Sequence, residues 1–530
     1  MGSLGEAAAA SARGSFIVFV GSSVARLVSA AGMIIVARLL SPSDYGLYGV
    51  SLVLPGLFSL FSDWGVNSAL IRFIARYESE GEAEKIRVLE EAGFLFKLAV
   101  GCVLSLALLL SADILAVVFL RRPEAGGLVK AASLLILFQS LYNTVISVLT
   151  SLDRMDGRAV VTVFQAMVKG VCSPFLVYFG FGVYGAIVGH VLSYSVAAAV
   201  GFLLTLPSML KLERPGGSAN FRDSLGLMLE FGLPLFFGGL IARFVTQLRG
   251  LLLSWFVSYE AIGNYHVASR FVSLVGIVTS SIGVVLYPTF SKFSHSEEPE
   301  KTREVFQSSV RYSAMVVLPL TAMLASLSNP AVYFLFTAKY PHAPLFFSFL
   351  LAPMLLVGLG SLSIGNFLNS QGDTGTNMKV GFSGSALAIL LYPVFVWMFG
   401  VEGLIIGIII SSLTRNLFGL YVLRRKYGIY PDLRHTGKTV LCSAVSAVSA
   451  YGAVQILSSS PLLSLFLGSA TFLTAYLLLA PVTGAIEGRD IENLDSMLRE
   501  LWVIYPFARL ILKLEEKILG LMHRRQSRNS

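Results

Sequence analysis

The chain has 530 residues, of which 55% are hydrophobic and only 13% are charged, and its mean hydropathy is +0.74. This composition excludes a soluble globular protein of this size and indicates a protein that resides in a membrane. The formal net charge of +9 does not indicate nucleic-acid binding, because the basic residues are distributed among loops and are not gathered in one patch.

Apolar stretches of about 20 residues follow one another from near Ser15 to near Gly484, each long enough to cross about 30 Å of hydrocarbon as a helix. Together they predict an all-α polytopic membrane protein with about 14 transmembrane helices. The expected spans are 15–38, 45–67, 93–120, 127–150, 159–180, 183–206, 230–257, 262–290, 310–336, 343–368, 379–399, 401–424, 438–458 and 461–484.

The second expected helix has a sharp beginning. Ser41 can cap its first turn, Pro42 suits the first helical position, and Asp44 completes a pattern that resembles a capping box. Local chemistry therefore fixes the point at which the chain enters this helix.

Three pairs of segments, separated by 217 or 218 residues, resemble each other. They are Gly21–Val28 (GSSVARLV) with Gly238–Val245 (GGLIARFV), Ser41–Val50 with Ser258–Val267, and Gly182–Ser193 with Gly400–Ser411. This similarity indicates an internal repeat.

The repeat predicts two pseudo-symmetric lobes of six helices each. Because six is an even number, both lobes begin on the same side of the membrane, and parallel repeats of this kind place the substrate between the lobes. The expected parts are an N-lobe (14–206), a linker (207–229), a C-lobe (230–424), an extra helix pair (438–484) and a tail (490–530).

Basic residues mark one side of this topology. The loops on the side of the N-terminus contain most of the lysine and arginine residues, whereas the opposite loops contain little beyond Arg121, Arg122 and Lys339. The positive-inside rule then places both termini in the cytoplasm, and no signal peptide is expected. The tail is amphipathic and is broken by Pro506, so we expect it to lie along the inner membrane surface.

Arg26 and Arg243 occupy matching positions of the repeat at bilayer depth. An arginine there costs at least about 2.5 to 3.5 kcal/mol, so the pair demands an explanation. Ser22 and Ser29 share the helix face of Arg26, and Gln247 shares that of Arg243, which favours a cavity that holds one anionic ligand. Alternatively, each arginine binds backbone carbonyls at a kink or pairs with an acid.

Four further basic residues within the spans are candidate substrate contacts: Lys169, Arg249, Arg270 and Arg415. Arg249, Arg270 and Arg415 could instead extend toward the membrane surfaces. We interpret Lys97 and Arg38, which lie close to helix ends, as such surface-seeking anchors.

Acidic residues are scarce in the spans. Asp63 and Asp113 lie toward helix ends, and the centres of the helices that carry Arg26 and Arg243 contain none. A cavity rich in arginine and poor in carboxylate should attract phosphate or pyrophosphate and repel a cationic drug. No carboxylate stands out for ion coupling, although Asp113 and His190 are open candidates.

Motifs of common catalytic sites are missing from the sequence, which has no Walker A loop, no HExxH and no GxSxG. Cys102, Cys172 and Cys442 lie in apolar spans without CxxC spacing, and we interpret them as packing residues. We therefore expect no enzymatic activity, no cofactor and no metal site.

The stretch from Ala37 to Ala75, and within it the leucine-x-Pro-x-acid-aromatic-Gly pattern at Leu40–Gly46, resembles the start of polysaccharide-transporter (Wzx-like) flippases. These belong to the multidrug/oligosaccharidyl-lipid/polysaccharide (MOP) exporter superfamily. The resemblance implies a V-shaped bundle that alternates between inward-open and outward-open states. It also implies transfer of an oligosaccharide on a polyprenyl pyrophosphate across the cell membrane, for polysaccharide or glycan assembly.

In this interpretation Arg26 and Arg243 hold the pyrophosphate. Lys169, Arg249, Arg270 and Arg415 guide it, and the extra helix pair forms a groove for the lipid tail. These roles follow from position and from the repeat, because no family motif fixes the individual arginines. The expected partners are the lipid-linked oligosaccharide, membrane lipids and other polysaccharide assembly proteins, with the protein acting as a monomer.

Two other functions stay open. One is a cation-coupled multidrug exporter of the same superfamily, which should carry an acidic residue in its cavity. The other is a passive lipid scramblase or assembly factor, which a test of energy-coupled transport separates from the first two functions.

Overall fold

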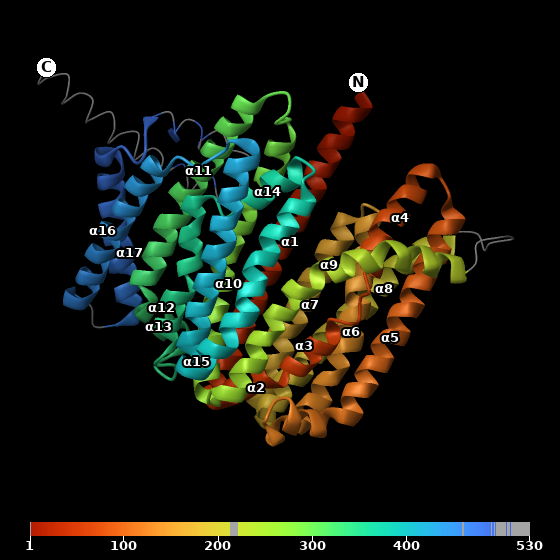
Figure 1. Cartoon of the computed structure of the whole chain (residues 1–530). Coiled ribbons are helices and arrows are strands. Elements are labelled where there is room, and N and C mark those ends of the chain that lie inside the picture. The colour runs from red at the N-terminus through yellow and green to blue at the C-terminus, as the bar shows by residue number, and fades with distance from the viewer. Residues whose placement is uncertain are drawn as a thin grey trace, which may run out of the picture. The chain divides into compact units, whose positions relative to one another are not determined.

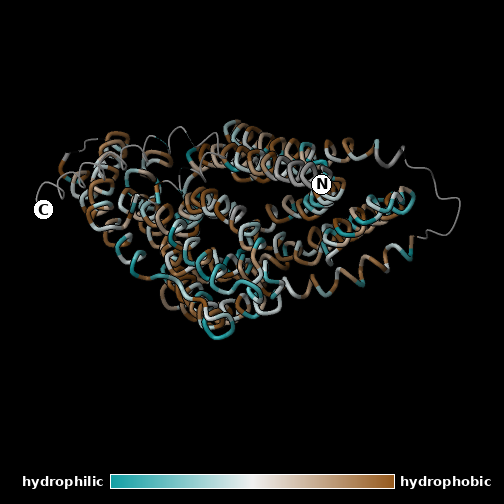
Figure 2. Tube along the Cα trace, turned by 90° about the horizontal axis from the view of Figure 1, so that it is seen from above, coloured by the Kyte–Doolittle hydropathy of each residue, from teal (hydrophilic) through white to brown (hydrophobic). Residues whose placement is uncertain are grey.

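The computed structural model describes residues 2–211, 221–457 and 460–488, together with positions 490, 491, 493, 495, 505 and 509. This part of the chain is mostly helical and contains no strand, which confirms the all-α class. Figure 2 shows hydrophobic residues along most of its helices. Ten described helices are long and apolar enough to cross a membrane, or eleven if a bent pair forms one span. The protein is therefore a multi-pass membrane protein, while the count of about 14 helices stays a prediction.

The contacts divide the chain into two compact units. The first comprises Met1–Arg270 with Ile389–Leu404, and the second comprises Phe271–Ala388 with Ile405–Ser530. The first unit contains the expected N-lobe and also the first helix of the expected C-lobe, so the lobe boundaries stay a prediction.

Figure 1 shows the helices by label. The first unit contains α1 (Gly2–Leu39), α2 (Pro42–Ser51), α3 (Val53–Ser59), α4 (Val66–Glu80), α5 (Ala83–Val118), η1 (Pro123–Ala125), α6 (Gly126–Ser151), α7 (Met155–Leu176), η2 (Val177–Phe181), α8 (Gly182–Lys211) and α9 (Phe221–Phe256). The second contains α11 (Pro299–Ser326), α12 (Ser328–Phe336), α13 (Ala343–Leu350), η3 (Ala352–Leu359), α14 (Ser363–Ser370), α16 (Leu433–Leu457) and α17 (Pro461–Thr483). The chain passes from one unit to the other within α10 (Tyr259–Ser291) and α15 (Thr374–Tyr427).

Packing within the first unit follows the chain only in part. The helix α7 packs against both α1 and α8, and α6 packs against both α5 and α8. The much shorter α2 and α3 contact α9. This arrangement brings α2 and α3 next to the helix that follows the linker.

Two glycines that match in the repeat break the chain direction in the same way. Gly182 has φ 51° and ψ −135°, and Gly400 has φ 60° and ψ −129°. Only glycine tolerates this region, because a Cβ would clash with the backbone. The breaks fall where the spans 159–180 and 183–206, and 379–399 and 401–424, were expected to meet.

The expectation of one continuous helix over 45–67 is wrong. The structure has α2, then α3, then a turn before α4 begins at Val66. Pro55 has no N–H to donate to the carbonyl of Ser51, and its ring would collide with that carbonyl, so α2 ends at Ser51. The predicted beginning of this helix is confirmed, because Ser41 accepts a hydrogen bond from the Asp44 amide at 3.1 Å.

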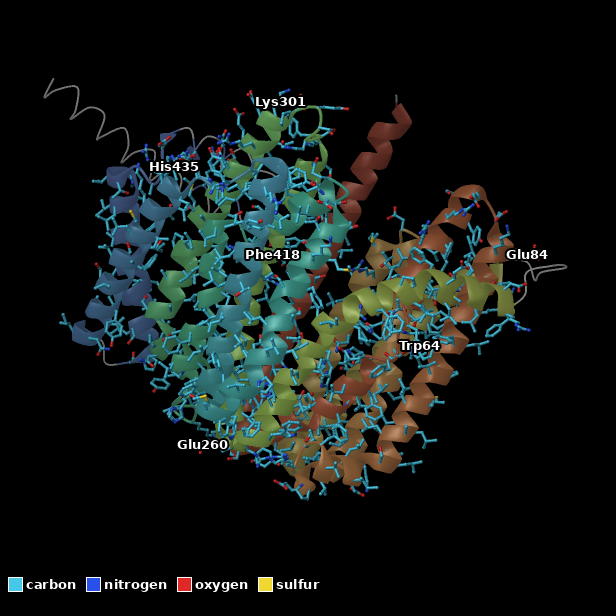
Figure 3. The ribbon with its side chains drawn as sticks, in the orientation of Figure 1. Trp64, Glu84, Glu260, Lys301, Phe418 and His435 are labelled. Carbon is cyan, nitrogen blue, oxygen red and sulfur yellow. The ribbon has the colours of Figure 1, made fainter. Side chains whose placement is uncertain are left out.

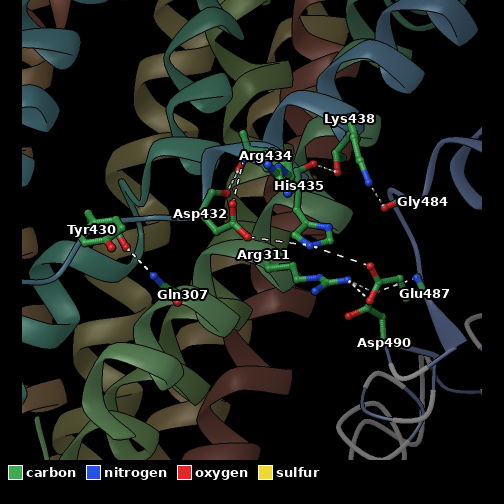
Figure 4. A network of polar contacts seen from close by, with 12 residues as sticks. Gln307, Arg311, Tyr430, Asp432, Arg434, His435, Lys438, Gly484, Glu487 and Asp490 are labelled. Atoms are coloured by element: carbon green, nitrogen blue, oxygen red, sulfur yellow. Dashed lines mark hydrogen bonds and ion pairs between the residues drawn. The ribbon is translucent and has the colours of Figure 1, made fainter. Parts of the chain in front are cut away.

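In the second unit, polar contacts attach the segment after α17 to α11 and to α16 (Figure 4). Arg311 on α11 pairs with Asp490 and with Glu487, the latter at 3.3 Å, and Lys438 on α16 donates to the Gly484 carbonyl at 3.3 Å. Lys301 and His435 lie at the same end of this unit (Figure 3). Most of the predicted amphipathic tail lies outside the described residues.

Candidate functional site

Two adjoining pockets lie against α9 in the first unit. The larger, of about 280 Å³, is the Arg270 pocket, and the smaller, of about 260 Å³, is the Arg243 pocket. Thr246 and Gln247 line both of them. The polar residues of the Arg270 pocket are Tyr45, Tyr48, Thr246, Gln247, Arg249, Tyr265, His266, Ser269 and Arg270. The Arg243 pocket is lined by Gly56, Ser59, Leu60, Gln139, Arg243, Thr246 and Gln247.

The helix α9 connects the two pockets through one face. Arg243, Thr246, Gln247 and Gly250 follow the i, i+3, i+4, i+7 spacing that places side chains on one side of an α-helix. The predicted contacts Arg243 and Gln247 therefore lie along a single polar track.

Arg270 on α10 lies beside two tyrosines of α2. Its guanidinium interacts with Tyr45 and Tyr48, whose side chains are only 1% and 2% exposed. Tyr45, Tyr48 and Arg270 all line the Arg270 pocket. Arg270 thus lies at the pocket wall beside the tyrosine hydroxyl groups, and the lining of this pocket contains no acidic residue.

Arg249 on α9 is anchored by an aromatic residue. It donates a hydrogen bond to the Tyr392 hydroxyl at 3.4 Å, and its guanidinium carbon lies 5.6 Å from the centre of the same ring. Its Nε atom is buried and has no hydrogen-bond partner among the described residues. This geometry keeps a second positive charge at the Arg270 pocket.

Lys169 lies behind the pocket instead of lining it. Its Nζ atom is 3.1 Å from Nε2 of His190, and Nδ1 of the same ring is 3.1 Å from the Tyr48 hydroxyl. Lys169 on α7 is therefore joined to the Arg270 pocket through α8 and α2. Position in the sequence alone did not indicate this indirect connection.

A close crossing of α2 and α10 brings Tyr45 and Tyr48 to Arg270. A Cβ added to Gly46 would lie 1.8 Å from the Tyr259 carbonyl oxygen, and one added to Gly263 would lie 2.0 Å from the Pro42 carbonyl oxygen. The contacts are reciprocal, since Gly46 and Gly263 match in the repeat, as do Pro42 and Tyr259. Glycine at both positions lets the two backbones meet.

None of the residues that line the two pockets is acidic, whereas three are arginines. Arginine donates paired hydrogen bonds that match phosphate and carboxylate groups. The arrangement can therefore bind an anion with several oxygen atoms. Within the described residues, no group of three or more His, Cys, Asp or Glu side chains could hold a metal ion.

The residues predicted on α1 lie elsewhere in the first unit. Gly21 and Gly32 pack closely on α7, and Arg26 points about 140° away from Gly21 and about 120° away from Gly32, given 100° per residue. Arg26 is exposed, and Ser22 and Ser29 are half-buried. None of these three residues lines the two described pockets.

The structure thus brings together Arg243, Gln247, Arg249 and Arg270 and links Lys169 to them. Arg415 belongs to the second unit, where its Cβ atom packs beside Gly384. The sequence reasoning did not identify Tyr45, Tyr48 or His266 as lining residues. The matching of Tyr48 with Tyr265 in the repeat was the available signal.

The structure also shows the partners of Lys97 and of Asp113. Lys97 does not extend to the membrane surface, because its side chain is only 1% exposed and pairs with Asp63 at 3.0 Å. A buried ammonium group without a partner would be strongly destabilising, and the Asp63 carboxylate supplies that partner. Asp113, an open candidate for ion coupling, pairs with Lys130 at 2.5 Å on the surface, where its side chain is 65% exposed.

The helical fold and its cationic, acid-free pockets define a multi-pass membrane protein with a site that can bind an anion. The chain belongs to the family described as "Polysaccharide biosynthesis protein", whose model matches residues 35–344. This match confirms the resemblance to polysaccharide transporters.

The similarity of the chain to an individual transport protein agrees with this family. The chain is 27% identical over 320 residues to the succinoglycan biosynthesis transport protein ExoT of Rhizobium meliloti, covering 58% of this chain and 59% of ExoT. The match therefore spans less than two thirds of that relative.

Solved structures show the same fold. The lipid II flippase MurJ in an inward closed conformation aligns with a TM-score of 0.70 at 16% identity, covering 88% of this chain and 99% of MurJ. An inward-facing multidrug resistance MATE family transporter of the MOP superfamily aligns with a TM-score of 0.62 at 16% identity, covering 77% and 94%. The expected superfamily fold is confirmed.

Proposed function

We propose that this protein is a flippase that moves a lipid-linked oligosaccharide, carried on a polyprenyl pyrophosphate, across the cytoplasmic membrane. The observation that carries the proposal is the pair of acid-free pockets along α9, with Arg243, Arg249 and Arg270 in their walls. The names of the relatives, a succinoglycan transport protein and a lipid II flippase, support the same class of cargo. The cargo serves cell-surface polysaccharide or glycan assembly.

The physical problem solved by such a protein is the passage of a charged, hydroxyl-rich head group. This head group cannot enter hydrocarbon, while the polyprenyl tail stays in the bilayer beside the protein. In the proposal, Arg249 and Arg270 bind the pyrophosphate with the help of Arg243. Gln139, Thr246 and Gln247 offer hydrogen bonds to sugar hydroxyls, and alternating access carries the head group across.

Arg26, with Ser22 and Ser29, and Arg415 are proposed as further contacts during other steps of the cycle. Arg26 is exposed on α1 and Arg415 is exposed on α15, so the described residues do not enclose either side chain. Lys169 acts behind the Arg270 pocket. Both termini are proposed to face the cytoplasm, from the distribution of basic loops, and the working form is a monomer.

A multidrug exporter is the second candidate function, because the MATE transporter shares the fold. Such an exporter needs an acidic residue to attract a cationic drug, and the described lining of the two pockets contains no acidic residue. Drug efflux from cells or vesicles tests this candidate directly. A passive scramblase, the third candidate, should move lipids without an ion or voltage gradient.

The test is flipping of a fluorescent polyprenyl-pyrophosphate oligosaccharide in proteoliposomes. Arg270→Gln should slow flipping about 10- to 150-fold, because a hydrogen bond to a charged group contributes about 1.5–3 kcal/mol. Arg76→Gln is the matched control, since Arg76 lies outside the pockets in a surface pair and is 61% exposed. A folded Arg270→Gln variant that flips the substrate at the rate of Arg76→Gln would overturn the proposed role of the pocket.

A further inference from the structure

A chain of hydrogen-bonding groups connects a buried lysine to the Arg270 pocket. Lys169 and Tyr48 are 7% and 2% exposed, and His190 lies between them with 3.1 Å from each ring nitrogen to its partner. Lys169 lies on α7, Tyr48 on α2 and His190 on α8, so this series of hydrogen bonds joins three helices. Only Tyr48 lines the pocket.

No carboxylate pairs with Lys169 or His190 in the described part of the chain. The charged and titratable neighbours are Arg270 and His266 on α10, Tyr45 on α2, Tyr194 on α8, and Tyr142 on α6, which contacts Tyr194. The only charged side chain among these neighbours is therefore the cation Arg270. If Lys169 and His190 were both protonated, the two cations would repel each other and Arg270 at short range. Lys169 and His190 together therefore carry at most one positive charge.

The imidazole allows this proton to move. When Lys169 is charged, it donates to Nε2 of His190, whose proton is then on Nδ1 and is donated to the Tyr48 oxygen. When Lys169 is neutral, Nε2 carries the proton and Nδ1 accepts from the Tyr48 hydroxyl. The two states differ by one proton.

The exchange between these states balances atom by atom. Lys169 gives a proton to Nε2, Nδ1 gives its proton to the Tyr48 oxygen, and the Tyr48 hydroxyl gives its original proton to water in the pocket. Lys169 ends neutral, His190 ends in its other tautomer, Tyr48 is unchanged, and the water gains the proton. The reverse sequence charges Lys169 from the pocket.

We propose that Lys169, His190 and Tyr48 form a proton site that couples proton uptake to anion binding in the Arg270 pocket. The inference rests on the proposed function, because the anion is the pyrophosphate of the substrate. Anion binding neutralises the field of Arg270 and adds negative charge near Tyr48, and both effects favour the protonated state of Lys169. By thermodynamic linkage, a proton on Lys169 favours anion binding by the same factor. Flipping is thereby coupled to the proton gradient without an acidic residue.

The experiment measures the affinity of the purified full-length protein for a short isoprenyl pyrophosphate between about pH 5 and 9. As the pH rises past the point where Lys169 loses its proton, the affinity of the wild type for the probe should fall. This fall should be steeper than that of Lys169→Met by up to about tenfold per pH unit, because the binding of one proton is linked to the binding of the probe. The probe itself titrates equally in both experiments, so the difference between the two pH slopes reports on Lys169, His190 and Tyr48. Wild type should also take up as much as one more proton per bound probe, read with a pH indicator in weak buffer.

Tyr48→Phe removes one oxygen atom and carries a second test. It should keep the amount of proton uptake and slow its rate in stopped-flow measurements, because the path from the pocket is cut. Tyr45→Phe is the matched control, because Tyr45 does not belong to the hydrogen-bonded series of Lys169, His190 and Tyr48. Its pH response and its rate of proton uptake should equal those of the wild type, whatever the substitution does to affinity. An uptake rate in Tyr48→Phe equal to that of Tyr45→Phe would overturn the path.

The outcomes separate the two proposals. A wild-type protein that binds no isoprenyl pyrophosphate contradicts the flippase itself. A wild-type protein that binds the probe with the same pH slope as Lys169→Met leaves the flippase standing and overturns the proton site alone. If Lys169→Met fails to fold, Tyr48→Phe still decides the inference.

Discussion

Replacing Gly263 with alanine should destabilise the first unit. The added Cβ atom would lie 2.0 Å from the Pro42 carbonyl oxygen, whereas ordinary contacts are 3.4–4 Å, so α2 and α10 must separate by more than about 1 Å. Overpacking of this kind costs about 1–3 kcal/mol, and a backbone neighbour places the cost at the upper end. The better helix propensity of alanine returns less than about 1 kcal/mol.

The assay is thermal or denaturant unfolding of the purified protein in detergent. Gly276→Ala is the matched control, because it lies on the same helix and has no atom within 4 Å of the added Cβ, so it should be neutral or slightly stabilising. Gly46→Ala should resemble Gly263→Ala, and the double variant should cost less than the sum, since the first change already separates the backbones. Equal stability of Gly263→Ala and Gly276→Ala would refute the close crossing.

Three further predictions concern single contacts. Ser41→Ala should lower the free energy of unfolding by about 1 kcal/mol by removing the cap of α2, and threonine at the same position should restore most of it. Lys97→Met should cost at most about 3 kcal/mol because it removes the buried ammonium group that pairs with the half-buried Asp63 carboxylate, and adding Asp63→Asn should recover part of the loss if the ion pair is the cause. Burial alone would raise the pKa of Asp373, but hydrogen bonds from Lys426 and two neighbours outweigh it and hold the pKa at about 2, below the ordinary 3.8. Because the folded-state pKa is lowered, the carboxylate stabilises the fold fully above about pH 4 and progressively less as the pH falls toward 2. The stability difference between wild type and Asp373→Asn should shrink over that window, and a constant difference would contradict this pKa.

Local signals in the sequence were reliable where one residue decides the backbone. Ser41 caps α2 as expected, and Gly182 and Gly400 end helices where the expected spans meet. Pro55 also carried a local signal for the break after α2, which the search for long apolar stretches passed over. The polar face of α9 followed from helical spacing around Arg243.

Contacts between distant segments were not predictable from the sequence. The crossing of Gly46 with Gly263 decides that tyrosines of α2 face Arg270, and no local rule specifies such a pairing. Lys97 is close to a helix end in the sequence, yet Asp63 pairs with it in the interior. The shared role of Arg26 and Arg243 stays a prediction, since only Arg243 lines a described pocket.

The most direct test of the central claim is the affinity of the protein for an isoprenyl pyrophosphate compared with the uncharged isoprenol of the same length. If the pockets on α9 bind the pyrophosphate, wild type should prefer the charged ligand by at least about 100-fold, or about 2.7 kcal/mol. Arg270→Gln should reduce this preference about tenfold or more, and Arg76→Gln should leave it unchanged. Equal affinities of the wild type for the two ligands, or a preference that is undiminished in a folded Arg270→Gln variant, would contradict the claim.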